Sequence, residues 1–135
     1  MNKTQLAGGV LLNQNGDILL LHRNTEEFDH WEVPGGKIDA GETAQITAGR
    51  ELKEELDVEV EVGDAIATAE FEDHGRMFVS TWFRVTTSQQ PRVAEPETFS
   101  ECQYVSLADL ETGQLPLSVG VQTLLGLVKS GHVSL

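Results

Sequence analysis

Three glutamates lie close together in one segment of the chain, at Glu51, Glu54 and Glu55. If this segment is a helix, with about 100° between successive residues, the three carboxylates share an arc of about 100°. Leu52 and Leu56 then lie on the opposite side. Like charges one helical turn apart, such as those of Glu51 and Glu55, cost about 0.2–0.5 kcal/mol. A hard divalent cation would offset that cost, because it prefers carboxylate and phosphate oxygens. A solvated helix face is the alternative that the segment alone leaves open.

The residues before these glutamates favour a ligand site. Pro34-Gly35-Gly36 breaks regular structure, and its glycines let the backbone approach a ligand closely because they have no Cβ atom. Thr43 is a good N-cap for a helix that runs from Thr43 to Leu56. A glycine-rich loop, a helix and a set of carboxylates thus form one continuous unit.

The whole unit resembles the Nudix box, whose pattern is G, five residues, E, seven residues, then R-E-U-x-E-E-x-G-U, with U a bulky aliphatic residue. Gly36 begins the box, Glu42 follows after five residues, and Arg50-Glu51-Leu52 follows after seven more. Lys53 to Val58 completes it, with one departure, because Asp57 stands at the position of the glycine. Upstream, the Trp31–Gly36 segment and the His22-Arg23 pair also resemble the family.

Two residues of the predicted helix region, Asp57 and Gly49, are unusual for their positions. Asp57 stands where the family has glycine, and aspartate tolerates the left-handed conformation that a helix end often needs. We therefore expect a small stability cost and no loss of activity. Gly49 is unusual inside a helix, where it costs about 1 kcal/mol relative to alanine. We attribute it to close packing against a sheet.

The resemblance implies an α/β protein, a Nudix-type α/β/α sandwich with a mixed β-sheet between helices, over a single domain of residues 1–135. It implies hydrolysis of a nucleoside diphosphate linked to another group, with Mg²⁺ or Mn²⁺ as cofactor. Carried over by position, Glu51, Glu54 and Glu55 would be metal ligands, assisted by a backbone carbonyl at Gly35 or Gly36. A metal bound there would activate water and polarise the phosphates.

The general base stays open between two positions. In some relatives it is the glutamate that matches Glu51, and in others it comes from a later loop. Here the loop contains Glu95-Pro96-Glu97, and we take Glu97 as its candidate, with a solvated surface acid as the alternative. The candidate catalytic residues are therefore Arg50, Glu51, Glu54 and Glu97.

Four residues are candidates for binding the substrate. Arg23 ends a predicted strand and could hold a phosphate, although an ordinary surface arginine fits equally well. Trp31 could stack on a base, although a structural aromatic residue is at least as good an interpretation. Gly35 and Gly36 would line the phosphate end of the site.

The substrate class rests on the resemblance alone. Relatives that cleave ADP-ribose often carry a proline about fifteen residues after the box, and this chain has Glu72-Asp73-His74-Gly75 there. The box and the Glu95–Glu97 loop look more like MutT-like nucleoside triphosphate pyrophosphatases, some of which act on modified nucleotides. The alternatives are ADP-ribose, a nucleotide sugar, a dinucleoside polyphosphate, or a non-catalytic module that binds a nucleotide.

Hydrophobic runs and turn signals place the other elements. We expect helices at Thr43–Leu56, Leu107–Leu110 and Leu117–Val128, and a surface loop at Thr86–Phe99. Asn15-Gly16 predicts a hairpin between the first two strands. The extended segments are Gln5–Leu12, Asp17–His22, Trp31–Gly36, Val58–Phe71 (one or two strands), Arg76–Val85 and Glu101–Val105.

Composition limits the partners. With 9 basic and 22 acidic residues the net charge is −13, which disfavours binding to nucleic acid. The sequence contains no apolar run near the ~18 residues of a membrane span. Met1–Gln5 lacks the apolar stretch of a secretory signal, and Cys102 is the only cysteine. We expect a cytoplasmic protein with a small-molecule nucleotide substrate and no membrane or nucleic-acid partner, and the sequence leaves a homodimer open.

Overall fold

The computed structural model describes residues 2–135 and contains seven strands and three helices. Four strands precede the first helix, three strands follow it, and two helices end the chain. The elements are β1 (Thr4–Leu11), β2 (Ile18–Asn24), β3 (Asp29–Glu32), β4 (Gly35–Lys37), α1 (Ala44–Leu56), β5 (Glu61–Asp73), β6 (Arg76–Thr86), β7 (Phe99–Val105), α2 (Leu107–Glu111) and α3 (Val119–Lys129).

The strands form two sheets. One has the order β4-β1-β6-β5 and is mixed, because β1 runs parallel to β6 and antiparallel to β4. The predicted mixed sheet is confirmed. The other sheet, β3-β2-β7, is antiparallel and was not predicted from the sequence.

The predicted turn at Asn15-Gly16 is present, but the predicted hairpin is wrong, because the first two strands do not pair with each other along their length. Gly16 adopts a positive φ of 80°, as the turn requires, but only Leu12 and Ile18 pair across it, in a single bridge. The two strands then enter different sheets. The reason is that β1 is paired on both edges, by β4 and β6, and β2 is paired on both edges, by β3 and β7.

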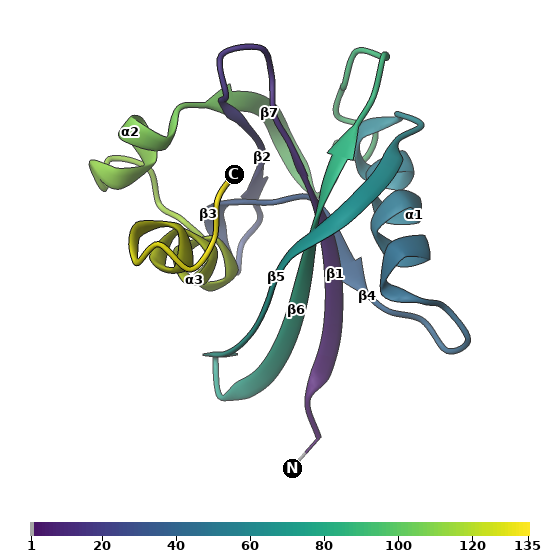
Figure 1. The fold of residues 1–135 in the computed structure, drawn as a ribbon, viewed down its shortest axis with the longest axis vertical. Coiled ribbons are helices and arrows are strands. Elements are labelled where there is room, and N and C mark those ends of the chain that lie inside the picture. The colour runs from purple at the N-terminus through teal and green to yellow at the C-terminus, as the bar shows by residue number, and fades with distance from the viewer. Residues whose placement is uncertain (1) are drawn as a thin grey trace.

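Helices cover both sides of the strands. In Figure 1, α1 lies on one side, and α2 and α3 lie on the other. Residues of β2 alternate between the two cores, because successive side chains of a strand point to opposite faces. Leu19 and Leu21 pack with α1, whereas Ile18 and Leu20 pack with the core that includes α3. None of the helices within residues 2–135 is long and apolar enough to cross a bilayer.

Helix α1 has the predicted phase and caps. Leu52 and Leu56 are fully buried, and the Thr43 hydroxyl accepts a hydrogen bond from the Ile46 backbone N–H. Asp57 ends the helix in the left-handed conformation, with φ 54° and ψ 44°. Its carboxylate accepts hydrogen bonds from Arg92 and Lys53, so this aspartate fixes the helix end through its side chain as well.

The predicted extended segment Trp31–Gly36 is wrong as a single strand, because it divides at Val33-Pro34 into β3 and β4, which lie in different sheets. The other elements match the prediction with shifted ends. The Val58–Phe71 segment gives one strand, β5, that is irregular between Val62 and Ala67. Helix α3 begins after Ser118, whose hydroxyl caps it. The start of α3 is tied to β3, because the Trp31 N–H donates to the Pro116 carbonyl and the Ser118 N–H donates to the Trp31 carbonyl.

The explanation of Gly49 by close packing is wrong, because a Cβ atom there would lie 3.7 Å from Val62 Cγ2, an ordinary contact. Gly49→Ala should therefore raise the free energy of unfolding by up to about 1 kcal/mol, measured by chemical denaturation. Gly9→Ala is the contrasting control and should lower it, because its Cβ would lie 3.0 Å from Leu52 and from Val85. A Gly49→Ala variant less stable than the parent would contradict this account.

Candidate functional site

Arg50 holds together the acidic side chains at the start of the site. It donates to Glu42 at 2.7 and 2.9 Å, to Glu51 at 3.1 Å and to Glu54 at 3.2 Å. A further hydrogen bond, at 3.3 Å, goes to the Lys37 carbonyl in β4. The hydrogen bonds from Arg50 lower the pKa of Glu42 to about 2. Arg50 thus links the loop after β4 to helix α1 and balances part of the negative charge.

Glu55 is a buried carboxylate. Only 4% of the residue is exposed, and its Oε1 accepts a hydrogen bond of 2.9 Å from the Gly35 backbone N–H. Burial raises the pKa of Glu55 well above its ordinary value, and the charges of Glu51 and Glu32 add to this rise. The structure therefore keeps a carboxylate in the protein interior beside other negative charges.

Glu51 lies directly beside Gly36. A Cβ atom on Gly36 would overlap the Glu51 carboxylate in its present position, so a side chain there would displace the flexible end of Glu51. Gly35 is constrained more strictly, because its Cβ would lie 2.6 Å from the Ala7 carbonyl oxygen, a backbone atom of β1. Burial raises the pKa of Glu51, Arg50 opposes that rise, and Glu54 adds to it. The glycines thus bring the backbone of β4 against the carboxylates of α1.

These residues fit a divalent cation by their chemistry. In the conformation described for residues 2–135, no three His, Cys, Asp or Glu side chains converge on one point. Glu51 and Glu54 turn toward Arg50, and Glu55 turns toward Gly35. Burial first and neighbouring negative charge second raise the pKa values of Glu51 and Glu55, and a bound cation would favour the ionised form of both.

The loop between β6 and β7 brings Glu95 rather than Glu97 toward these carboxylates. The Ala94 N–H donates to the Glu55 carbonyl at 2.9 Å, which fixes the loop on the end of α1. Burial raises the pKa of Glu95, and the charges of Glu54 and Glu97 add to the rise. The charge of Glu95 in turn raises the pKa of Glu51. Glu97 is exposed.

Arg23 is already paired. It donates to Glu32 at 2.8 and 3.1 Å, and its guanidinium lies over the Phe99 ring at 4.9 Å. His30 also contacts Glu32, at 2.8 Å. Burial opposes ionisation of Glu32, but the hydrogen bonds from His30 and Arg23 lower the pKa of Glu32 below its ordinary value. To hold a phosphate, Arg23 would have to share its guanidinium with Glu32.

Trp31 lies in the core. It is 5% exposed, and its ring stacks on His22 with centroids 4.7 Å apart and an interplanar angle of 8°. It packs with Trp82 and residues of α3. This position favours the structural role that the sequence left open as the alternative to base stacking.

A cavity of about 280 Å³ opens between the mixed sheet, β3 and the start of α3. Gly35 and Gly36 line one part of it, next to the carboxylates of α1. Phe71 and Phe78, which stack on each other with centroids 5.5 Å apart, line another part. The other lining residues are Leu6, Ala7, Gly8, Arg23, Phe28, His30, Glu32, Val33, Pro34, Asp73, Ser80, Trp82, Ser118, Gly120 and Val121.

The family model for the NUDIX domain matches residues 3–121. The chain belongs to the Nudix family. The 8-oxo-dGTP diphosphatase of Escherichia coli K12 is 33% identical to it over 85 residues, which are 62% of this chain and 65% of that protein. A relative from Bacillus subtilis is 31% identical over 117 residues, 84% of this chain and 70% of that protein. Matches to two other Nudix relatives span only 39% and 22% of their lengths.

Solved structures of Nudix proteins share the fold. The MutT Nudix hydrolase from Burkholderia pseudomallei superposes with a TM-score of 0.82 at 27% identity, over 93% of this chain and 98% of that one. A MutT protein from Methanosarcina mazei gives a TM-score of 0.83 at 20% identity, over 98% of both chains. Nudix hydrolases generally need divalent metal ions, which agrees with the carboxylates on α1.

Sequence reasoning missed several residues of this site. Glu32 of β3 pairs with Leu21 of β2, and Leu21 is two positions before Arg23. The contact between Glu32 and Arg23 therefore depends on the pairing register of the two strands, which the sequence does not show. The cavity lining of β6 has a visible signal, because Phe78, Ser80 and Trp82 alternate with the residues that face α1. Nothing local in the sequence distinguished Glu95 from Glu97.

In the metal-free protein, Glu55→Gln should increase stability at pH 7–8, because it removes a buried charge while keeping an oxygen that can accept from Gly35. The pKa of Glu55 is raised in the folded state above its ordinary 4.5, so the parent loses stability as the pH rises through that folded pKa. The stability difference between variant and parent should therefore shrink as the pH falls toward 4.5. Urea unfolding at several pH values measures it, and a destabilised variant at pH 8 would contradict the assignment.

Proposed function

We propose that this chain is a metal-dependent pyrophosphohydrolase that cleaves a nucleoside triphosphate, including oxidised or otherwise modified ones, to the monophosphate and pyrophosphate. One observation carries the proposal: the cavity reaches Gly35 and Gly36, and these two glycines lie against Glu55 and Glu51. A bound nucleotide can thus place its phosphates at the carboxylates and its base among the aromatic residues of the cavity.

The names of relatives support a nucleotide substrate. Besides the 8-oxo-dGTP diphosphatase, the CTP pyrophosphohydrolase of Escherichia coli K12 is 35% identical over 70 residues, 50% of this chain and 52% of that protein. Both names refer to nucleoside triphosphates. The net charge of −13 disfavours a polyanionic substrate such as RNA, whose binding depends on basic side chains.

Glu51, Glu54 and Glu55, with the Gly35 carbonyl, are the residues proposed to hold Mg²⁺ or Mn²⁺. A divalent ion bound there supplies Lewis-acid polarisation of the phosphate oxygens and a more acidic water. Water adds to one phosphorus and the phosphoanhydride bond breaks, so one water is consumed for each monophosphate and pyrophosphate released. Arg50 orients Glu51 and Glu54 through the hydrogen bonds that it donates to both.

The general base is proposed to be a glutamate that faces the carboxylates of α1. Glu51 is one candidate. Glu95 is the better loop candidate, because its charge acts on both Glu51 and Glu55, whereas Glu97 is exposed. Arg23 and the glycines Gly35 and Gly36 are proposed to contact the phosphates, with Arg23 sharing its guanidinium with Glu32.

A panel of nucleoside triphosphates assayed with Mg²⁺ or Mn²⁺ should yield monophosphate and pyrophosphate, and a chelator should abolish turnover. Glu54→Gln should lower turnover by orders of magnitude while the protein remains folded. ¹⁸O-water then shows the point of attack, since label in the monophosphate means the α-phosphorus and label in pyrophosphate means the β-phosphorus. Full turnover in chelator, or inorganic phosphate as the first product, would refute the proposal.

The two loop glutamates should differ in their pH–rate profiles. If Glu95 is the base, Glu95→Gln should lower kcat by about 10²-fold or more and remove the acidic limb of the profile. That limb should lie above pH 4.5 in the parent, because the pKa of Glu95 is raised from 4.5 and the base must be ionised. Glu97→Gln should cause a smaller loss and keep the limb. The reverse pattern would return the role to Glu97, and an intact limb in both variants would favour Glu51.

A further inference from the structure

Ser80 is a buried polar residue with no partner for its side chain. Thr47, Glu55 and Ser80 are the buried polar or charged residues within residues 2–135. The Thr47 hydroxyl bonds to Glu42, and Glu55 accepts from Gly35, whereas the Ser80 hydroxyl makes no hydrogen bond to any described residue. Ser80 is only 5% exposed and lines the cavity. Within residues 2–135, every side-chain polar atom that is completely buried has a hydrogen-bond partner. Since the Ser80 hydroxyl has none, it is not completely buried and is open to the cavity.

The surroundings of Ser80 suit a planar ring. On the same face of β6 it lies between Phe78 and Trp82, and all three line the cavity. Phe71 of β5 is directly opposite Phe78 and stacks on it. Aromatic side chains bind the face of a nucleobase by stacking. A partnerless hydroxyl among aromatic rings is thus placed to read the polar edge of a base.

The position of Ser80 within the sheet agrees with the length of a nucleoside. Ser80 pairs with Leu6 of β1, and Leu6 pairs on its other side with Lys37 of β4. Two strand spacings therefore separate Ser80 from the strand that carries Gly36, about 10 Å. If the phosphates bind at Gly36, the sugar would lie over β1 and the base over β6.

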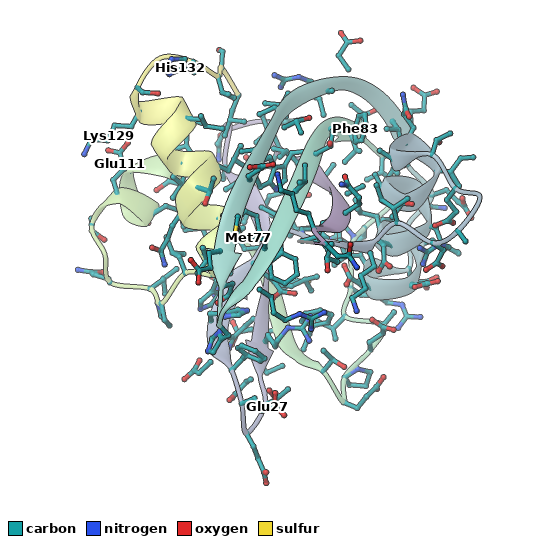
Figure 2. The ribbon with its side chains drawn as sticks, turned by 90° about the horizontal axis from the view of Figure 1, so that it is seen from below. Glu27, Met77, Phe83, Glu111, Lys129 and His132 are labelled. Carbon is teal, nitrogen blue, oxygen red and sulfur yellow. The ribbon has the colours of Figure 1, made fainter. Side chains whose placement is uncertain are left out.

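The charges of the lining favour a base that donates hydrogen bonds. Of the two carboxylates that border the cavity, Glu32 is already paired with Arg23 and His30, whereas Asp73 has one oxygen left to accept a hydrogen bond. Asp73 is held by His74 at the β5–β6 turn. The loop between β2 and β3, whose tip carries Glu27, projects from the body of the protein in Figure 2, and Glu27 and Asp73 both line a neighbouring cavity. Negative charge on this side of the cavity, from Asp73 and the nearby Glu27, favours a base edge that carries amino groups over one made of carbonyl oxygens.

We propose that Ser80 is a specificity-determining residue, whose hydroxyl accepts a hydrogen bond from an exocyclic amino group of the base. The substrates would then be nucleotides of guanine, adenine or cytosine type, in preference to those of uracil or hypoxanthine. The inference rests on the proposed function, because it assumes that the cavity takes a nucleotide.

The test compares matched substrates that differ in the amino group. The parent should have a higher kcat/KM for CTP than for UTP, or for GTP than for ITP. Ser80→Ala should reduce that ratio about 3- to 10-fold, the effect of one neutral hydrogen bond. Thr81→Val is the matched control, because Thr81 lies on the other face of β6 and bonds to Thr68; it should leave the ratio unchanged.

The thermal stability of Ser80→Ala shows whether Ser80 recognises the base or supports the fold. Because the Ser80 hydroxyl has no partner in the protein, Ser80→Ala should unfold at the same temperature as the parent or higher. An unchanged base ratio in an active Ser80→Ala variant, or a changed preference between ribose and deoxyribose instead, would overturn the inference and leave the proposed function standing. If the parent hydrolyses no nucleotide of the panel with Mg²⁺ or Mn²⁺, the proposed function itself fails.

Discussion

Negative charge crowded onto one face of α1 is the constraint on which the site depends. Glu51, Glu54 and Glu55 lie within two turns, and Glu55 is buried. Burying a charge is unfavourable unless it is paired or bound to a metal. Arg50 offsets part of this charge through Glu51 and Glu54, and Glu55 has a single backbone N–H as its partner. The helix therefore holds its carboxylates in a state that a divalent cation would stabilise.

The fold places the acidic face of α1 against the glycine backbone of β4. Gly35 is needed because a Cβ atom there would overlap the backbone of Ala7, and a Cβ atom on Gly36 would displace the Glu51 carboxylate. The β6–β7 loop covers the end of α1 by donating to its last carbonyls, and this brings Glu95 toward the same carboxylates. The mixed sheet then extends the site from the glycines to the aromatic residues of β6.

Local features were predictable from the sequence, and features that depend on distant partners were not. The phase of α1, its Thr43 cap and the left-handed Asp57 follow from neighbouring residues. The separation of β1 and β2 into two sheets depends on β4, β6, β3 and β7, which no local turn signal reveals. Arg23 looked free to bind a phosphate because its partner Glu32 is brought beside it only by strand pairing. Trp31 likewise acquires its place in the core through contacts with α3.

Binding of Mn²⁺, observed through the backbone amides by NMR, tests the central claim most directly. A paramagnetic ion broadens the signals of nearby nuclei, so substoichiometric Mn²⁺ should first broaden Gly35, Gly36, Glu51 and Glu55. The same titration of Glu55→Gln should show weaker broadening at these residues. Broadening centred elsewhere, for example on Asp73 and His74, with the Gly35 and Gly36 signals unaffected, would contradict the account that the glutamates of α1 hold the metal.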